Sequence, residues 1–90
     1  RYPSVLKLVR GIYDQGKIVA AICHAGSVLI SAGIVRGHKA TGSAGIRDDL
    51  INAGAEWVDA PAVRDGNLVW GRVVEDIPAF CRELVKALEE

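Results

Sequence analysis

Length, composition and charge restrict this chain to one small domain of mixed α/β type. It has 90 residues, half of them hydrophobic, with ten glycines and few aromatic residues, which is typical of aliphatic strands joined by tight turns. Eleven basic and eleven acidic side chains balance, so the composition indicates neither a nucleic-acid partner nor an anionic membrane. Its longest apolar runs are far too short for a membrane span.

The first part of the chain predicts a helix, a strand and a second helix. A helical pattern begins at Pro3 and stops at Gly16. Residues 18–22 are wholly apolar, as expected for a central strand of a parallel sheet that is covered on both faces. Residues 27–32 then form a helix. Alternation of this kind favours a parallel sheet with right-handed crossovers.

The remaining elements are short until the last helix. They are expected to be strands at 39–41 and 56–58, a helix at 46–53 and a hairpin at 63–69 that turns at Asp65–Gly66. The last helix, at about 76–88, carries an apolar stripe of Ile77, Phe80, Cys81, Leu84 and Leu88. Because Cys81 falls on that stripe, we expect it to be a structural cysteine in the core.

The strongest functional signal is residues 17–27, KIVAAICHAGS. An apolar strand ends at Cys23, and small residues and a helix follow at once, which is the strand–turn–helix geometry of a nucleophile elbow. Unpaired N–H groups and the partial positive charge of the helix start favour the thiolate, and His24 offers a base or a cation. The alternative is a buried, inert cysteine, but such a cysteine does not need the small residues that follow here.

The other polar residues predict no second site. His38, between Gly37 and Lys39, is interpreted as a solvated loop residue, and Asp48 and Asp49 as carboxylates that complement a helix dipole. No His, Cys or Asp cluster has metal-ligand spacing and no phosphate loop is present, so we expect neither a metal nor a cofactor. Two cysteines far apart do not form a disulfide framework, which favours the cytoplasm.

Three segments carry a resemblance to a known family: AICHAG, IRDDLINAGAEWVD and DGNLVWGR. With them the chain resembles the C-terminal half of a PfpI-type intracellular cysteine protease. That family lies in the superfamily of the parkinsonism-associated protein deglycase and the class I glutamine amidotransferases. The resemblance covers essentially the whole chain. It implies a flavodoxin-like α/β parallel-sheet sandwich, with residues 1–90 as a single PfpI-like domain that lacks its N-terminal half.

The resemblance also assigns roles to the elbow residues. It implies that Cys23 is the nucleophile, that His24 is its partner and that the backbone N–H of His24 contributes to an oxyanion hole. A second N–H from a glycine-rich loop, and an acidic residue that some members take from a neighbouring subunit, would lie upstream of this sequence.

Departures from the family pattern concern the substrate rather than the fold. Glycine and proline commonly follow the Cys-His pair, where this chain has Ala25 and Gly26, and residues 42–45 are a glycine-bearing segment that we interpret as flexible. Trp70 stands next to Gly71, where the family commonly has serine. Ala25, Gly26 and Trp70 are therefore the candidate substrate-binding residues.

Two classes of function remain open at this point. The first is a cysteine hydrolase or lyase that acts on peptides or on small reactive carbonyl compounds. The second is a non-catalytic redox sensor or chaperone-like protein of the stress response, since an exposed thiolate oxidises readily. The resemblance further implies homo-oligomers, dimers or hexamers, and an N-terminal half of the same domain as a packing partner.

Overall fold

The computed structural model of the protein describes residues 3–89, the side chain of Val74 excepted, and contains every element that the sequence predicts. The helices are α1 (Pro3–Asp14), α2 (Gly26–Ser31), α3 (Arg47–Asn52) and α4 (Ile77–Glu89). Single 3-10 turns, η1 (Cys23–Ala25), η2 (Ala44–Ile46) and η3 (Val74–Asp76), precede the last three. The strands are β1 (Val19–Ile22), β2 (Lys39–Ala40), β3 (Glu56–Trp57), β4 (Ala62–Asp65) and β5 (Leu68–Gly71).

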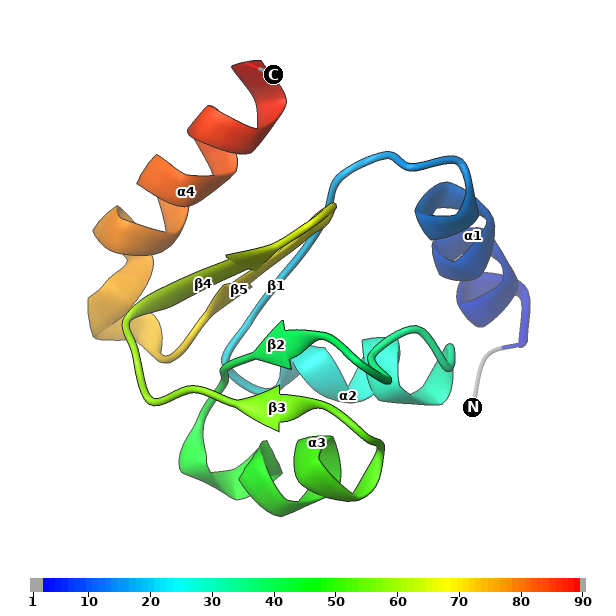
Figure 1. Ribbon diagram of the computed structural model, residues 1–90, viewed down its shortest axis with the longest axis horizontal. Helices are drawn as coiled ribbons and strands as arrows, with labels where there is room; N and C mark the ends of the chain where they lie inside the picture. Colours follow the sequence, from blue (N-terminus) through cyan, green and yellow to red (C-terminus); the bar gives the residue numbers. More distant parts are fainter. Residues whose placement is uncertain (1–2, 90) are drawn as a thin grey trace.

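Two small sheets form the centre of the molecule (Figure 1). In the larger sheet β5 lies between β1, to which it is parallel, and β4, to which it is antiparallel. In the smaller one β2 and β3 run parallel. The β4–β5 hairpin turns at Gly66, whose φ of 60° fits the first central position of a type II′ turn. The parallel pairs and the hairpin agree with the predicted α/β architecture.

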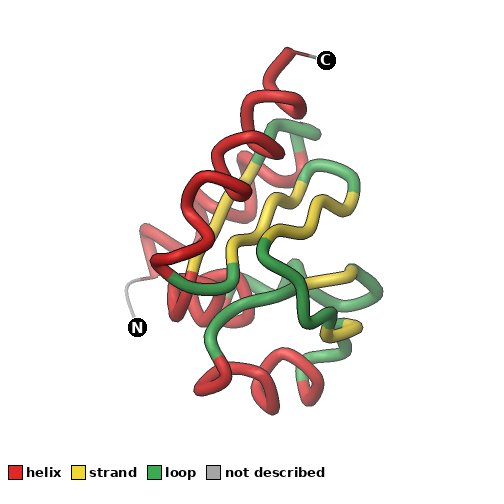
Figure 2. The backbone as a smooth tube through the Cα atoms, turned by 90° about the vertical axis from the view of Figure 1, so that its left-hand side faces the viewer, coloured by secondary structure: helices red, strands yellow, loops and turns green. Residues whose placement is uncertain are grey.

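Helices cover the larger sheet on both sides, and the core cluster joins residues of this sheet to residues of α2, α3 and β2. Helix α4 packs on β4 and β5, whereas α1 and α2 lie on the other side of the sheet (Figures 1 and 2). The largest fully buried apolar side chains are Trp70, Leu50, Leu68, Val35 and Val69. Burial of each such side chain stabilises the fold by roughly 1.5–3 kcal/mol.

The elbow strand is not central, in contrast to the sequence prediction. Strand β1 lies at the edge of its sheet, and of its four residues only Ala21 is buried, while Ala20 is exposed. Strand β5 occupies the centre and is buried throughout. The reason is that, within residues 3–89, β1 has one partner strand only. Its apolar sequence is that of a strand with neighbours on both sides.

The prediction that Cys81 lies in the core is wrong, because Cys81 is exposed on α4. Ala87 is buried, Phe80 and Leu84 are half-buried, and Leu88 is 65% exposed. The apolar stripe of this helix is wider than its contact with β4 and β5. Side chains at the margin of the stripe, Cys81 among them, therefore face solvent.

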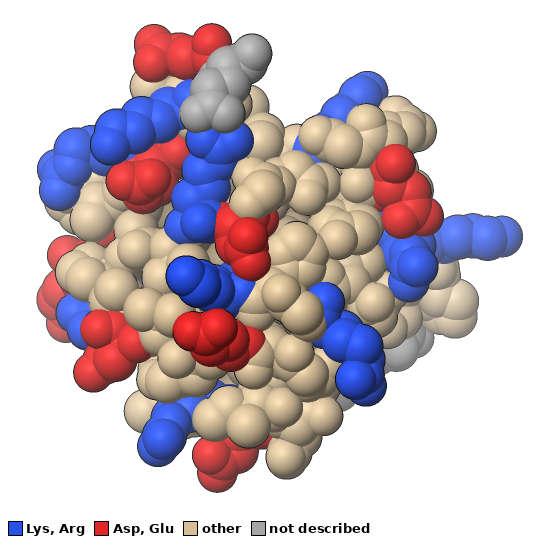
Figure 3. All heavy atoms as spheres, in the orientation of Figure 1, with Lys and Arg blue, Asp and Glu red and all other residues tan. Residues whose placement is uncertain are grey.

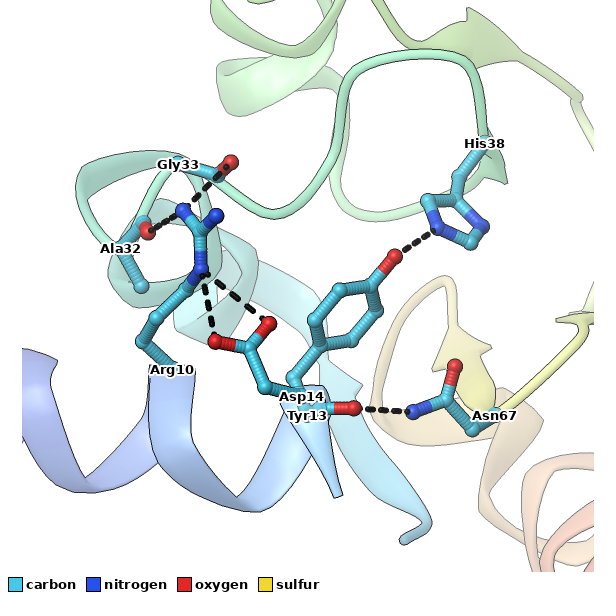
Figure 4. A network of polar contacts seen from close by, with 7 residues as sticks. All are labelled: Arg10, Tyr13, Asp14, Ala32, Gly33, His38 and Asn67. Atoms are coloured by element: carbon cyan, nitrogen blue, oxygen red, sulfur yellow. Dashed lines mark hydrogen bonds and ion pairs between the residues drawn. The ribbon is translucent and has the colours of Figure 1, made fainter. Parts of the chain in front are cut away.

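Helix α1 has no fully buried residue; its half-buried Val9 and Tyr13 pack against the core, and polar contacts add to its attachment (Figure 4). Arg10 Nη1 lies 3.4 Å from the carbonyl oxygens of Ala32 and Gly33, the two residues that directly follow α2. The same guanidinium pairs with Asp14 one turn further along α1. The Arg10 guanidinium thus lies at the C-terminus of α2, where backbone carbonyl groups point outward and a cation is favourable.

A second contact joins the end of α1 to the loop before β2 and corrects the prediction for His38. The His38 side chain is only 17% exposed, with Nε2 2.7 Å from the Tyr13 hydroxyl (Figure 4) and Nδ1 3.3 Å from a carboxylate oxygen of Asp65. The Nδ1 contact has ion-pair distance but not hydrogen-bond geometry. Asn67 Nδ2 donates to the Tyr13 carbonyl. His38 is therefore a packed residue and not a solvated one.

The replacement Tyr13→Phe should lower the free energy of unfolding by about 1 kcal/mol. It removes the hydroxyl that bonds to His38 and keeps the ring, and a single half-buried hydrogen bond has about that net value. Urea unfolding followed by circular dichroism measures the change. A midpoint equal to that of the wild-type chain would show that this contact does not hold α1 in place.

The surface carries both signs of charge without segregation on the face shown in Figure 3. Acidic and basic side chains alternate along the α4 side, and uncharged surface occupies the middle, between α4 and α1. Among residues 3–89, no helix combines the length and the apolar character that crossing a bilayer requires.

Candidate active site at the end of strand β1

Cys23 occupies a strained turn at the carboxyl end of β1. Ile22 is still extended, with φ −134° and ψ 147°, and Cys23 then takes φ 62° as the chain enters η1 and α2. It is the one non-glycine residue with positive φ in the described part of the chain. A side chain in this region costs of order 1–3 kcal/mol and persists where the surrounding structure imposes it, which is characteristic of functional turns.

Close packing beneath the turn explains the small residues after Cys23. A Cβ atom on Gly26 would lie 2.8 Å from the Trp70 ring and 2.9 Å from Cδ1 of Ile46. The first turn of α2 therefore rests directly on Trp70. Trp70 and Gly26 are buried, whereas Ala25 is exposed. Substrate contact by these three residues remains a prediction, and the burial of two of them favours a supporting role.

Residues 42–45, interpreted from sequence as flexible, form a wall packed against the elbow. Gly42 and Ser43 are buried, and the Ser43 N–H donates to the carbonyl of Cys23 at 3.4 Å. A Cβ atom on Gly42 would lie 2.9 Å from that same carbonyl oxygen, and one on Gly45 would lie 2.7 Å from His24 Nε2. These glycines permit close approach to the elbow, a packing role that the interpretation of residues 42–45 as flexible did not include.

The His24 side chain is exposed and contacts this wall. Both of its ring nitrogens lie 3.2 Å from the hydroxyl of Ser43. Within residues 3–89 no hydrogen bond links the His24 ring to the Cys23 sulfur, although the two residues are adjacent. Sequence reasoning missed Ser43, because its contact with His24 joins positions 19 residues apart in sequence.

Arg72 directly follows β5, at the same end of the sheet as Cys23, and it bonds to two carboxylates. Its Nε donates to Asp76 and its Nη1 to Asp59, both at 2.9 Å. These hydrogen bonds, that to Asp76 first, raise the pKa of Arg72 above its ordinary value. The guanidinium therefore joins the start of α4 to the segment after β3. Among the described residues, no three His, Cys, Asp or Glu side chains gather as a metal site would require.

Comparison with known proteins decides the family of the chain. The model of the DJ-1/PfpI family matches residues 1–87. The chain belongs to the DJ-1/PfpI family. A deglycase of Pyrococcus horikoshii is 52% identical over 86 residues, which are 96% of this chain and 52% of the relative. Deglycase PfpI of Pyrococcus furiosus is 49% identical over 86 residues, again 96% of this chain and 52% of the relative.

Solved structures of the DJ-1/PfpI family confirm the fold. A two-domain protein of Anabaena variabilis with DJ-1/ThiJ/PfpI-like and ferritin-like domains superposes with a TM-score of 0.95 at 39% identity, over 99% of this chain and 26% of that one. The predicted family and the flavodoxin-like α/β class are both confirmed. The chain spans about half the length of the curated relatives it matches.

The positive φ of Cys23 in this DJ-1/PfpI chain predicts which of two variants at this position is the more stable. Cys23→Gly should be about 1 kcal/mol more stable than Cys23→Ala, because glycine adopts positive φ without the cost that a Cβ atom brings. At an ordinary backbone position the order is reversed. Chemical denaturation of the two variants decides the sign, and a more stable alanine variant would contradict a positive φ at this residue.

Proposed function

We propose that this DJ-1/PfpI chain carries the nucleophile of a thiol-dependent deglycase or related hydrolase, and that Cys23 is that nucleophile. The observation that supports this most is the positive φ of Cys23, the first residue of η1 directly after β1, which is the backbone geometry of a nucleophile elbow. The relatives named deglycases favour a carbonyl substrate over a peptide. Both cysteines are free thiols, which suits a reducing cytoplasm as the proposed location.

In the carbonyl reaction, the Cys23 thiolate adds to the aldehyde carbon of an α-oxoaldehyde. The S–C bond forms as the C=O π bond opens, and the oxygen takes a proton from His24 to give a hemithioacetal. The His24 N–H, among the first of the turn and so without a partner within the helix, is the proposed donor to the developing oxyanion. On a peptide, the same addition would be followed by loss of the amine, protonated by His24, and hydrolysis of the thioester.

Protection from alkylation tests this assignment. The chain is incubated with methylglyoxal and then with iodoacetamide, and peptide mass spectrometry measures the label on each cysteine. We expect the dicarbonyl to protect Cys23 and to leave Cys81 reactive, since Cys81 is exposed on a helix without such a turn. Equal protection of both thiols would mean ordinary thiol chemistry. Oxidation of Cys23 without protection would favour the redox-sensor alternative.

We propose further that strands from an N-terminal half of the same domain pair with the free edge of β1. Val19 N–H bonds to Asn67 on the β5 side, and directions alternate along a parallel strand, so the N–H groups of Ala20 and Ile22 point to the other edge. A groove of about 800 Å³ lies beyond the amino end of β1, between the ends of α1 and α4, and is lined by Ile12, Gly16, Lys17, Ile18, Arg64, Gly66, Asn67, Ala87 and Leu88. Amide hydrogen exchange at Ala20 should slow on addition of such a half.

Apolar side chains left in solvent offer surfaces for the proposed homo-oligomer. Val5 and Leu8 on α1 are 46% and 62% exposed, and Val85 on α4 is 51% exposed. Val5 and Leu8 lie three residues apart and so on the same face of α1, and adjacent exposed apolar side chains form the kind of patch that an association surface needs, whereas a single one is ordinary. Light scattering over a concentration series would test the proposal, and a monomer at all concentrations would contradict it for this chain.

A further inference from the structure

Gly45 closes one edge of the His24 ring, and a side chain at this position would have no room beside the ring. A Cβ atom on Gly45 would lie 2.7 Å from Nε2, 3.5 Å from Cε1 and 3.7 Å from Cδ2 of His24. The three heavy atoms nearest to that position thus all belong to the ring. Because the distance increases on both sides of Nε2, Gly45 approaches the edge of the ring and not its face.

The face of the same ring lies against Ser43. The Ser43 hydroxyl is 3.2 Å from both ring nitrogens, and it lies over the ring, because a position between them in the ring plane would collide with Cε1. Ser43 is buried and its N–H bonds to the Cys23 carbonyl, which fixes it relative to the turn. Ser43 and Gly45 therefore form a seat for the ring, one at its face and the other at its edge, although His24 as a whole is exposed.

The backbone gives no reason for a glycine at position 45. The φ of Gly45 is not in the positive range that Gly37 and Gly54 adopt, and the residue lies on the surface in the helical turn η2. In a helical conformation alanine is favoured over glycine, because glycine loses more conformational freedom on folding. Alanine would therefore be the more stable residue here, and what glycine provides is room for the His24 ring.

We propose that Gly45 is a positioning residue for His24: because it has no side chain, the ring lies in the seat, and from there it protonates the oxygen of the adduct on Cys23. This rests on the proposed function. In that step the imidazolium gives one N–H proton to the alkoxide oxygen and becomes neutral, and the new S–C bond is kept. A methyl group at position 45 would push the ring out of the seat, and a displacement of about 1 Å is enough to reduce a rate about a hundredfold.

The test compares Gly45→Ala with Gly11→Ala, a matched variant that adds the same methyl group to a helical glycine where it meets nothing within 4 Å. The His24 ring is the free end of an exposed side chain and can move aside, so we expect Gly45→Ala to fold with a urea midpoint no lower than that of the wild-type chain. Its kcat for methylglyoxal should fall roughly tenfold to a hundredfold while KM stays within about twofold. Gly11→Ala should keep the wild-type kcat.

Two further measurements show whether Gly45 acts through His24. In a double-mutant cycle, Gly45→Ala is added to His24→Ala, and without the ring the methyl group should change kcat by less than about twofold. Nuclear Overhauser effects between the α-protons of Gly45 and the ring protons of His24 report the seat directly. We expect them in the wild-type chain and expect Gly45→Ala to lose them.

The outcomes separate this inference from the proposed function. The role of Gly45 would be overturned by an unchanged or higher kcat in Gly45→Ala, by an equal loss of kcat in both backgrounds, or by the absence of these Overhauser effects in the wild-type chain. A Gly45→Ala variant that does not fold would overturn it as well, because the methyl group would then meet more than a movable ring. A His24→Ala variant with the wild-type kcat would instead contradict the proposed function.

Discussion

Replacing Cys23 by serine should reduce consumption of a dicarbonyl substrate at least about a thousandfold, whereas Cys81→Ser should stay within about twofold of the wild-type rate. An alcohol ionises far less readily than a thiol, so a serine in the same turn is a much weaker nucleophile. Cys81 is a fair control because it is also a free thiol, and the more exposed of the two.

The measurement is the loss of dicarbonyl absorbance at equal protein concentration, with folding of both variants confirmed by circular dichroism. Comparable rates for Cys23→Ser and the wild-type chain would remove Cys23 from the mechanism. Equal losses in both variants would indicate a reaction that depends on thiol content and not on the elbow.

Gly42→Ala should destabilise the fold by roughly 1–3 kcal/mol, the usual cost of forcing an extra methyl group into a packed site. Its Cβ atom would lie 2.6 Å from Cδ1 of Ile46 and 2.9 Å from the carbonyl oxygen of Cys23. The isoleucine terminus can rotate away, but the carbonyl belongs to the elbow. Relief of the contact would therefore move Cys23, and we expect the variant to lose activity as well as stability.

The matched control is Gly11→Ala, in the middle of α1, where a Cβ atom would meet nothing within 4 Å. Alanine is favoured over glycine in a helix by roughly 0.5–1 kcal/mol, so this variant should gain stability. Urea midpoints of the two variants should therefore move in opposite directions. A Gly42→Ala variant as stable as the wild-type chain would show that the wall is not packed against the turn.

The local sequence pattern was sufficient to predict the helices and strands and the turn at Cys23. The apolar run before Cys23 and the small residues after it reflect requirements of a few neighbouring residues, which a sequence displays directly. The hairpin was predicted for the same reason, because Gly66 supplies the positive φ that its turn requires.

Contacts between distant segments were not predicted. Residues 42–45 look flexible in isolation, and only the structure shows that Gly42 and Gly45 allow approach to the elbow. His38 is packed because Tyr13 lies 25 positions away in sequence and 2.7 Å away in space. Cys81 is exposed because the width of an apolar stripe does not reveal how much of it the sheet covers. Each error is one of tertiary contact and not of local propensity.

The rate of iodoacetamide alkylation at Cys23 relative to that at Cys81, mapped by peptide mass spectrometry at neutral pH, tests the central claim most directly. If the elbow presents an activated thiol, Cys23 should react at least about tenfold faster than Cys81, although Cys81 is the more exposed of the two. Equal rates, or a faster reaction at Cys81, would contradict the account.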